Sequence, residues 1–276
     1  MKQNNWNNWF NINVTEQESG KILKYGNLLG LNYSNGKYYG SNFERGLLLR
    51  QIIRSKKPKR ILELGTGRGF GTICMADCIV SEGLNCSIET IDCISASTRQ
   101  SWPHAKKAEF FREDIAVDEF WSKEFNNLKS CIKMHCGKTS DVIIQLLKES
   151  KEFDFIFMDA AHDLASVFLD LSGGIALLAT GGCMLLDDFA PMESFGTATC
   201  IAVKHVKKYF SNVEIIDTEG TVYNSEISPQ SRRSMVFLEN KNNLKTHFNP
   251  SFHRVMLLRV FGRMLEWLHS PAAFKV

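Results

Sequence analysis

One stretch decides the fold of this chain, and it reads Arg60-Ile-Leu-Glu-Leu-Gly-Thr-Gly-Arg-Gly-Phe-Gly71. It opens with a short apolar run, which is typical of a buried parallel strand, and glycine then takes every second position from 65 to 71. Residues 72–82 continue with the spacing of a helix. A strand, a glycine turn and a helix in this order predict a doubly wound α/β fold with a ligand at the turn, because glycine lets a ligand approach the backbone. The alternative is an ordinary βα turn that happens to be rich in glycine.

The glycine spacing distinguishes between kinds of ligand. The dinucleotide pattern G-x-G-x-x-G, begun at Gly65, needs glycine at position 70, where this chain has Phe70. The spacing E-x-G-x-G-x-G fits instead, and it resembles the first motif of the class I S-adenosylmethionine (SAM) methyltransferases. This resemblance implies that the turn lies against the methionine part of SAM, whose ammonium group an acid binds directly or through water. The cofactor residues that it implies here are Glu63, Gly65, Thr66, Gly67 and Gly69.

Length and composition limit the remaining choices. A chain of 276 residues with 44% hydrophobic and 23% charged residues suggests one large globular domain or a domain with additions. The formal charge of +3 is too small to indicate a nucleic-acid partner. The eight cysteines are scattered without C-x-x-C spacing and no signal-peptide pattern opens the chain, so a reduced cytoplasmic protein is expected. No apolar stretch reaches the roughly 18 residues of a membrane span.

Further apolar runs predict a mostly parallel sheet of seven strands with helices on both faces. After the first strand, such runs lie at 87–92, 131–135, 153–159 and 183–188, and a last pair lies at 213–216 and 235–238. Segments with helical spacing separate most of the runs. The expected fold class is therefore α/β, doubly wound and Rossmann-like, over residues 42–240.

The two ends of the chain lie outside this predicted domain. Residues 1–41 are expected to form either an arm that packs its aromatic side chains on the body or a cap over the substrate. Residues 241–276 are expected to form a polar loop and an apolar helix over 252–269. A helix this apolar needs a partner, which is its own domain, a second subunit in a homodimer, or a membrane surface.

Polar residues after the second and third strands extend the expected cofactor site. Asp92 ends the second strand, at the spacing from the glycine turn at which this fold places a carboxylate on ribose hydroxyls. The alternative is an aspartate that only caps a turn. The turn after the third strand holds Gly137, Thr139 and Ser140, and it lies where adenine is expected. Thr139, Ser140 or Asp141 can also cap the following helix.

Three acids end two further strands. Asp159 follows the fourth strand, and Asp187 and Asp188 follow the fifth. In open α/β sheets, ligands bind beyond the carboxyl ends of the strands, and three carboxylates there repel one another unless a positive group neutralises them. A hard divalent cation such as Mg²⁺ binds oxygen ligands and keeps room for substrate oxygens. The alternative is that one aspartate caps a helix and another faces water.

His162 follows Asp159 by three residues, at the start of the next helix. This position directs it toward the same pocket, where a histidine can accept a proton from a hydroxyl group. A surface or helix-capping histidine is the alternative. We therefore regard His162, with Asp159, as the candidate catalytic residues.

The stretch from Gly137 to Phe189 resembles the metal-dependent small-molecule O-methyltransferases of the catechol and macrolide-sugar groups. The resemblance assigns Asp159, Asp187 and Asp188 as metal ligands, although catechol enzymes have Asp-Asn at the last two positions. It also places His162 where the catechol type has a lysine base. An Asp-x-x-His followed downstream by Asp-Asp looks more like the bacterial group that includes sugar-modifying enzymes. The resemblance covers about residues 43–240.

The expected activity is transfer of a methyl group from SAM to a hydroxyl of a small molecule, such as a sugar, a phenol or a natural product. Mg²⁺ or another divalent cation is the expected second cofactor. The alternatives are a metal-independent N- or O-methyltransferase and a non-catalytic SAM-binding partner protein. Phe70 argues against a nicotinamide dehydrogenase.

Overall fold

The structure is a computed structural model, and it describes residues 1–5, 9, 14–34, 36–40, 43–106, 109–190, 196–218, 227–228 and 234–240. The expected apolar helix over 252–269, and with it the predicted homodimer contact, lies outside the described residues.

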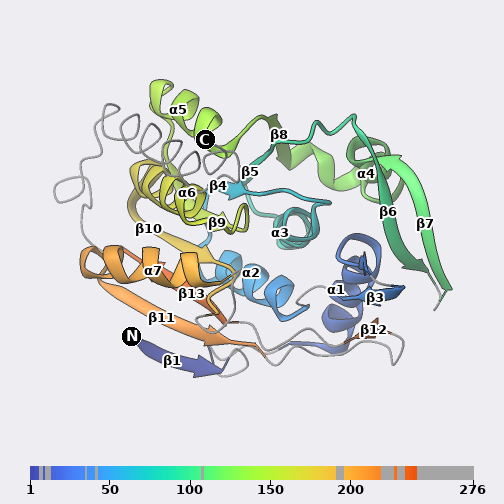
Figure 1. Cartoon of the computed structure of the whole chain (residues 1–276), viewed down its shortest axis with the longest axis horizontal. Helices are drawn as coiled ribbons and strands as arrows, with labels where there is room; N and C mark the ends of the chain where they lie inside the picture. The colour runs from blue at the N-terminus through green and yellow to red at the C-terminus, as the bar shows by residue number, and fades with distance from the viewer. Residues whose placement is uncertain are drawn as a thin grey trace, which may run out of the picture.

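The centre of the molecule is an eight-stranded sheet with the order β1-β11-β13-β10-β9-β4-β5-β8 (Figure 1). Only β13 runs antiparallel to its neighbours, and the other pairs are parallel. The strands are β1 Lys2–Asn5, β4 Arg60–Leu64, β5 Ser87–Asp92, β8 Ile132–Cys136, β9 Phe153–Met158, β10 Leu178–Leu186, β11 Asn212–Asp217 and β13 Ser234–Glu239. The predicted fold class is confirmed.

The predicted number of seven strands is wrong, because β1 adds an eighth at the edge of the sheet. Its sequence, Lys2-Gln-Asn-Asn5, contains no apolar residue, so the hydrophobic pattern could not reveal it. It pairs with β11 through its backbone, and Gln3 Nε2 donates to Asp217 Oδ2 over 2.6 Å. An edge strand of this kind needs no apolar face.

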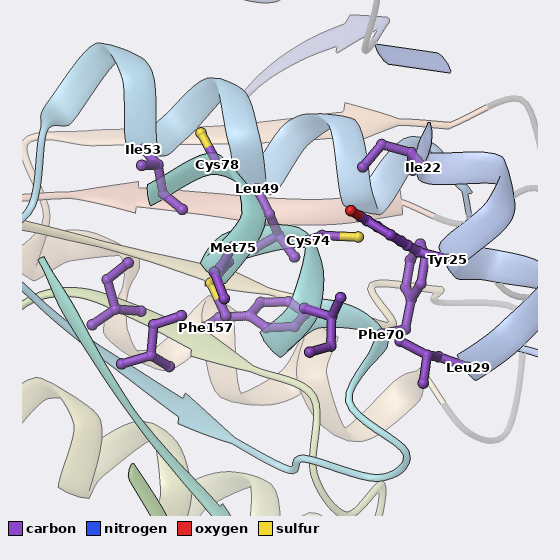
Figure 2. Packing of buried hydrophobic residues seen from close by; sticks show 14 of the residues in the cluster. Ile22, Tyr25, Leu29, Leu49, Ile53, Phe70, Cys74, Met75, Cys78 and Phe157 are labelled. Atoms are coloured by element: carbon purple, nitrogen blue, oxygen red, sulfur yellow. The ribbon is translucent and has the colours of Figure 1, made fainter. Parts of the chain in front are cut away.

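Helices cover both faces of the sheet. On one face lie α1 Glu16–Leu29, α2 Phe43–Lys56 and α3 Phe70–Ser81, and on the other lie α5 Thr139–Lys148, α6 Leu164–Leu177 and α7 Thr197–Val206. Alternate residues of one strand serve the two layers, because successive side chains of a strand point to opposite faces. Phe157 of β9 packs with α2 and α3 (Figure 2), while its neighbours Ile156 and Met158 pack with the other layer.

The helix α1 lies within the segment expected to be an arm or cap. Thr15 caps the start of this helix by accepting the Glu18 N–H. Ile22 of the helix is fully buried in the same hydrophobic cluster as residues of α2 and α3 (Figure 2). Arg50 of α2 bonds Glu18 over 2.6 Å and Asp77 of α3 over 2.5 Å, so a buried ion-pair network joins the three helices. This part of residues 1–41 therefore belongs to the body of the protein.

A β-hairpin of β6 Arg99–Lys106 and β7 Glu109–Ala116 occupies a region that the sequence pattern could not order (Figure 1). The helix α4, Val117–Glu124, and a 3₁₀ helix, Asn126–Cys131, follow it. Trp102 anchors the hairpin, since its ring is fully buried and stacked on Phe120, and its indole N–H donates to the Leu28 carbonyl of α1. Near α1, the short strands β2 Asn32–Ser34, β3 Lys37–Tyr39 and β12 Ile227–Ser228 form a small separate sheet.

Candidate active site

The glycine turn after β4 uses its first two glycines differently. Gly65 has φ +94°, and a Cβ atom there would lie 2.1 Å from the backbone oxygen of Asp159. Gly67 has φ +54°, and a Cβ atom there would meet nothing within 4 Å. Gly65 therefore lets the turn pass against the end of β9, whereas Gly67 faces open space where a ligand can approach.

Two adjoining cavities open at the carboxyl ends of the strands. The larger pocket has a volume of about 490 Å³, and the predicted residues that line it are Gly65, Gly67, Asp92, Thr139, Ser140 and Asp159. The smaller pocket has a volume of about 310 Å³, and the predicted residues that line it are Glu63, Gly65, Thr66, Gly67, Asp159, His162 and Asp188. Gly65, Gly67 and Asp159 border both pockets, so the two spaces meet at the glycine turn.

Three predicted residues line neither pocket. Gly69 lies against Trp121, where an added Cβ atom would come within 2.1 Å of the indole ring. Gly137 lies beside Val142, at 3.3 Å from such a Cβ atom. Asp187 is buried and does not border either pocket. The Trp121 ring accounts for glycine at position 69, and a backbone φ of +153° accounts for glycine at position 137, without a ligand contact.

The wall of the smaller pocket comes partly from the segment that follows α1. Leu29, Gly30 and Asn32 line it, and Arg68 of the glycine turn holds this wall in place. Its guanidinium group donates to the Leu31 carbonyl and, over 2.6 Å, to Asn32 Oδ1. The glycine turn and the N-terminal segment are thus joined by a side chain that the sequence pattern did not single out.

Asp92 borders the larger pocket and already shapes the glycine turn. Its Oδ2 atom accepts the Gly67 N–H over 2.7 Å, and its Oδ1 atom accepts the Ile94 N–H over 2.8 Å. The capping contact is therefore present. A carboxylate has lone pairs for further donors, so the ribose contact stays a prediction.

We expect Asp92→Ala to weaken SAM binding roughly 10- to 100-fold, the scale of losing hydrogen bonds to a charged group. The fold should persist, because the side chain lies at the pocket rim. Isothermal titration with SAM measures the change, and Asp118→Ala, at an exposed aspartate of α4, is the control. If the Asp92 variant bound SAM as tightly as the parent protein, the Asp92 carboxylate would serve only to cap the turn.

Behind the expected adenine turn lies an acid that the sequence analysis missed. The Thr139 hydroxyl donates to Asp170 Oδ1 of α6 over 2.5 Å, and Asp170 borders the larger pocket. Burial raises the pKa of Asp170 to about 7. The Oδ2 atom has no hydrogen-bond partner among the described residues. The available signal was a single acid between the apolar residues Val167 and Leu171 of the same helix.

Glu63 is buried beneath the glycine turn. Its carboxylate accepts the Thr72 hydroxyl and, over 2.6 Å, the Thr90 hydroxyl. Burial raises the pKa of Glu63 to about 7, and the two hydroxyl donors only partly oppose this rise. The group therefore changes charge close to neutral pH.

This pKa predicts how stability depends on pH. The folded protein holds a proton on Glu63 that the unfolded chain releases above the ordinary pKa of 4.5. The free energy of unfolding should therefore fall as pH rises from 4.5 to about 7, by up to about 3 kcal/mol from this group. Glu63→Gln should remove this contribution. Denaturant unfolding of both proteins at about pH 5 and about pH 8 checks it, and equal pH dependence would contradict the buried-acid interpretation.

The structure brings together the three acids that the sequence placed at strand ends. One carboxylate oxygen each of Asp159, Asp187 and Asp188 lies within 4.8 Å of the others. Burial raises the pKa of Asp159 well above its ordinary value, and the positive charge of Arg45 opposes that rise. Asp188 has φ +55°, a left-handed conformation that costs energy for a residue with a side chain and often occurs at functional sites.

Two side chains contact this acid cluster. His162 Nδ1 lies 3.2 Å from Asp188 Oδ2, and its half-exposed ring borders the smaller pocket. Arg45 of α2, which the sequence analysis missed, places Nη1 2.6 Å from Asp159 Oδ2 and 2.5 Å from Asp187 Oδ2. The other oxygen of Asp187, Oδ1, is buried without a partner among the described residues. The cluster thus contains one cation of its own and one unsatisfied acceptor.

Known proteins resemble this chain in one stretch of sequence and in fold. Residues 62–189 match a family model described as a methyltransferase domain. The fold resembles that of cofactor-bound Rv0187 from MTB, with 15% identity, a TM-score of 0.53, and coverage of 86% of this chain and 94% of that one. It also resembles the O-methyltransferase TomG from Streptomyces achromogenes in complex with SAM, with 16% identity, a TM-score of 0.51, and coverage of 85% and 94%. No curated protein matches the chain in sequence.

The sheet, the glycine turn and the pockets at its carboxyl edge define the class I methyltransferase fold. Residues 62–189 of the chain match a methyltransferase domain, so the resemblance to the class I methyltransferases drawn from the sequence is confirmed. None of the helices in the described part of the chain has the length and hydropathy to cross a membrane.

Proposed function

We propose that this protein transfers the methyl group of SAM to a hydroxyl group of a small molecule. The observation that carries the proposal is the junction of the two pockets at Gly65, Gly67 and Asp159, with His162 beside it. The larger pocket, beside Asp92 and the Thr139 turn, suits the adenosine part of SAM. The smaller pocket then receives the methionine part and the acceptor. TomG, described as an O-methyltransferase of Tomaymycin synthesis, supports an acceptor of this kind.

The acid cluster fits a divalent cation in its donor chemistry. Asp159, Asp187 and Asp188 offer hard oxygen atoms, and the buried Asp187 Oδ1 lacks a partner among the described residues. These three aspartates would hold the ion, which when bound would polarise the acceptor hydroxyl and lower its pKa.

The chain's own residues would hold the reactants in line and move one proton. The glycine turn fixes the methionine side of SAM, and the wall at Asn32 limits where an acceptor oxygen can lie. Most of the rate increase then comes from positioning the oxygen opposite the sulfonium methyl. Asp188 holds the Nδ1 side of His162, which makes Nε2 the ring nitrogen that can take the hydroxyl proton.

A second candidate function is methyl transfer without a metal. It is favoured by one observation, the contact of Arg45 with both Asp159 and Asp187, because this guanidinium already neutralises part of the cluster.

All eight cysteines are free thiols, which supports the proposed reducing, cytoplasmic location under either function.

Chelation separates the two functions. Formation of S-adenosylhomocysteine is first screened over a panel of sugars, phenols and other hydroxylated compounds. With an acceptor in hand, excess EDTA should abolish methyl transfer, and Mg²⁺ should restore it. Asp159→Asn should mimic chelation while SAM affinity, measured by titration, stays within a few-fold of that of the parent protein. Full activity in excess chelator would rule out the metal-dependent mechanism and favour the second candidate.

A further inference from the structure

Arg45 is a buried member of the acid cluster and not a surface residue beside it. Its side chain is 11% exposed, and its guanidinium carbon lies 5.4 Å from the centre of the Phe70 ring and 5.9 Å from that of Phe157. The guanidinium group thus lies beside the rings of Phe70 and Phe157, and its Nη1 atom contacts Asp159 and Asp187. Its Nε atom has no hydrogen-bond partner among the described residues, so the Nη1 contacts are its main polar anchor.

The position of Nη1 matters for any ion in this cluster. A magnesium ion lies roughly 2.1 Å from each ligand oxygen. Nη1 already lies 2.6 Å from Asp159 Oδ2 and 2.5 Å from Asp187 Oδ2. An ion that bridged these same two oxygens from the side of the guanidinium would overlap with that nitrogen. An ion that used other oxygens, such as the unpartnered Asp187 Oδ1, would still lie next to the guanidinium charge and be repelled by it.

We propose that Arg45 is a built-in cation that competes with the divalent ion for Asp159 and Asp187. The inference rests on the proposed function of this cluster and adds the residue that sets its affinity for metal. The ion binds tightly only when the guanidinium gives up its two contacts. Because coupling between two binding events is reciprocal, removing the guanidinium must strengthen ion binding, and a bound ion must loosen Arg45.

The test measures binding of Mn²⁺ alone to the full chain, from the electron paramagnetic resonance signal of the free ion. Arg45→Met keeps an apolar stem between the two aromatic rings and removes the charge. It should lower the dissociation constant for Mn²⁺ at least about tenfold. Arg45→Lys keeps a charge and should stay within about threefold of the parent protein. Arg60→Gln removes an exposed arginine at the opposite end of β4, and it should change nothing.

Each outcome bears on the proposal. Equal Mn²⁺ affinity in the parent and in Arg45→Met would overturn the competition and leave the metal site intact. Equally tight binding by the Lys and Met variants would overturn it too, because the effect would then come from shape and not from charge. Binding to neither the parent nor the Met variant would overturn the competition together with the metal part of the proposed function. If Arg45→Met unfolds without an ion, recovery of its fold in Mn²⁺ supports the proposal, and failure to recover counts against it.

Discussion

Gly65→Ala should abolish SAM binding and lower the free energy of unfolding by roughly 3 kcal/mol or more. The new Cβ atom would lie 2.1 Å from the Asp159 oxygen, 2.6 Å from its carbonyl carbon and 2.7 Å from the Ala160 Cα atom. These are backbone atoms, so no side-chain rotation relieves the overlap. Either the glycine turn or the end of β9 must shift, and both border the two pockets.

The matched control for this variant is Gly67→Ala, two residues along the same turn. Gly67 also has a positive φ, of 54°, but its Cβ position is open. The substitution should cost only about 1 kcal/mol from the left-handed conformation. The larger Gly67→Val should leave the turn in place but fill the ligand space and remove SAM binding. Denaturant unfolding and titration with SAM measure both properties. A Gly65→Ala protein with parental stability and SAM affinity would show that the turn does not press against β9.

His162→Ala should lower turnover by roughly 100-fold or more, the scale of general base catalysis. SAM affinity should fall far less than turnover, because His162 does not border the larger pocket, which suits the adenosine part of SAM. His205→Ala is the control, since His205 lies on α7 and contacts the Ile201 carbonyl of its own helix. Turnover is followed as S-adenosylhomocysteine formation with the acceptor found in the screen, over a range of pH. A parental rate at every pH would reduce His162 to a structural contact of Asp188.

The central strands could be predicted because each one carries enough information in its own sequence. Phe153-Asp-Phe-Ile-Phe-Met158 is buried at almost every position and ends at an acid, so a short apolar run located both the strand and its functional end. The α1 helix escaped prediction although Ile22, Tyr25 and Leu29 have helical spacing, because Gly20, Gly26 and Asn27 dilute the pattern. The hairpin escaped because most of β7 alternates poorly and stays partly exposed.

Some residues of the candidate site could likewise be predicted from the sequence, and others could not. Glu63, Asp92 and Asp159 could be placed because each stands at a strand end next to a turn, where the fold itself defines the location. Arg45 could not, because in sequence it is one charge within a helix, and its partners lie 114 and 142 positions away. Local patterns contain no information about such a contact.

The tie between Arg68 and the N-terminal segment has a consequence for how this protein can change its acceptor. The larger pocket is lined by β5, α5, α6 and the turns after β4 and β9, whereas one wall of the smaller pocket comes from Leu29, Gly30 and Asn32 near the start of the chain. Substitutions or short insertions after α1 would reshape that wall, and Arg68 needs from it little more than the Leu31 carbonyl and one side-chain oxygen. Under the proposed function, acceptor preference can therefore diverge among descendants of this chain through its first forty or so residues, while the larger pocket is inherited unaltered.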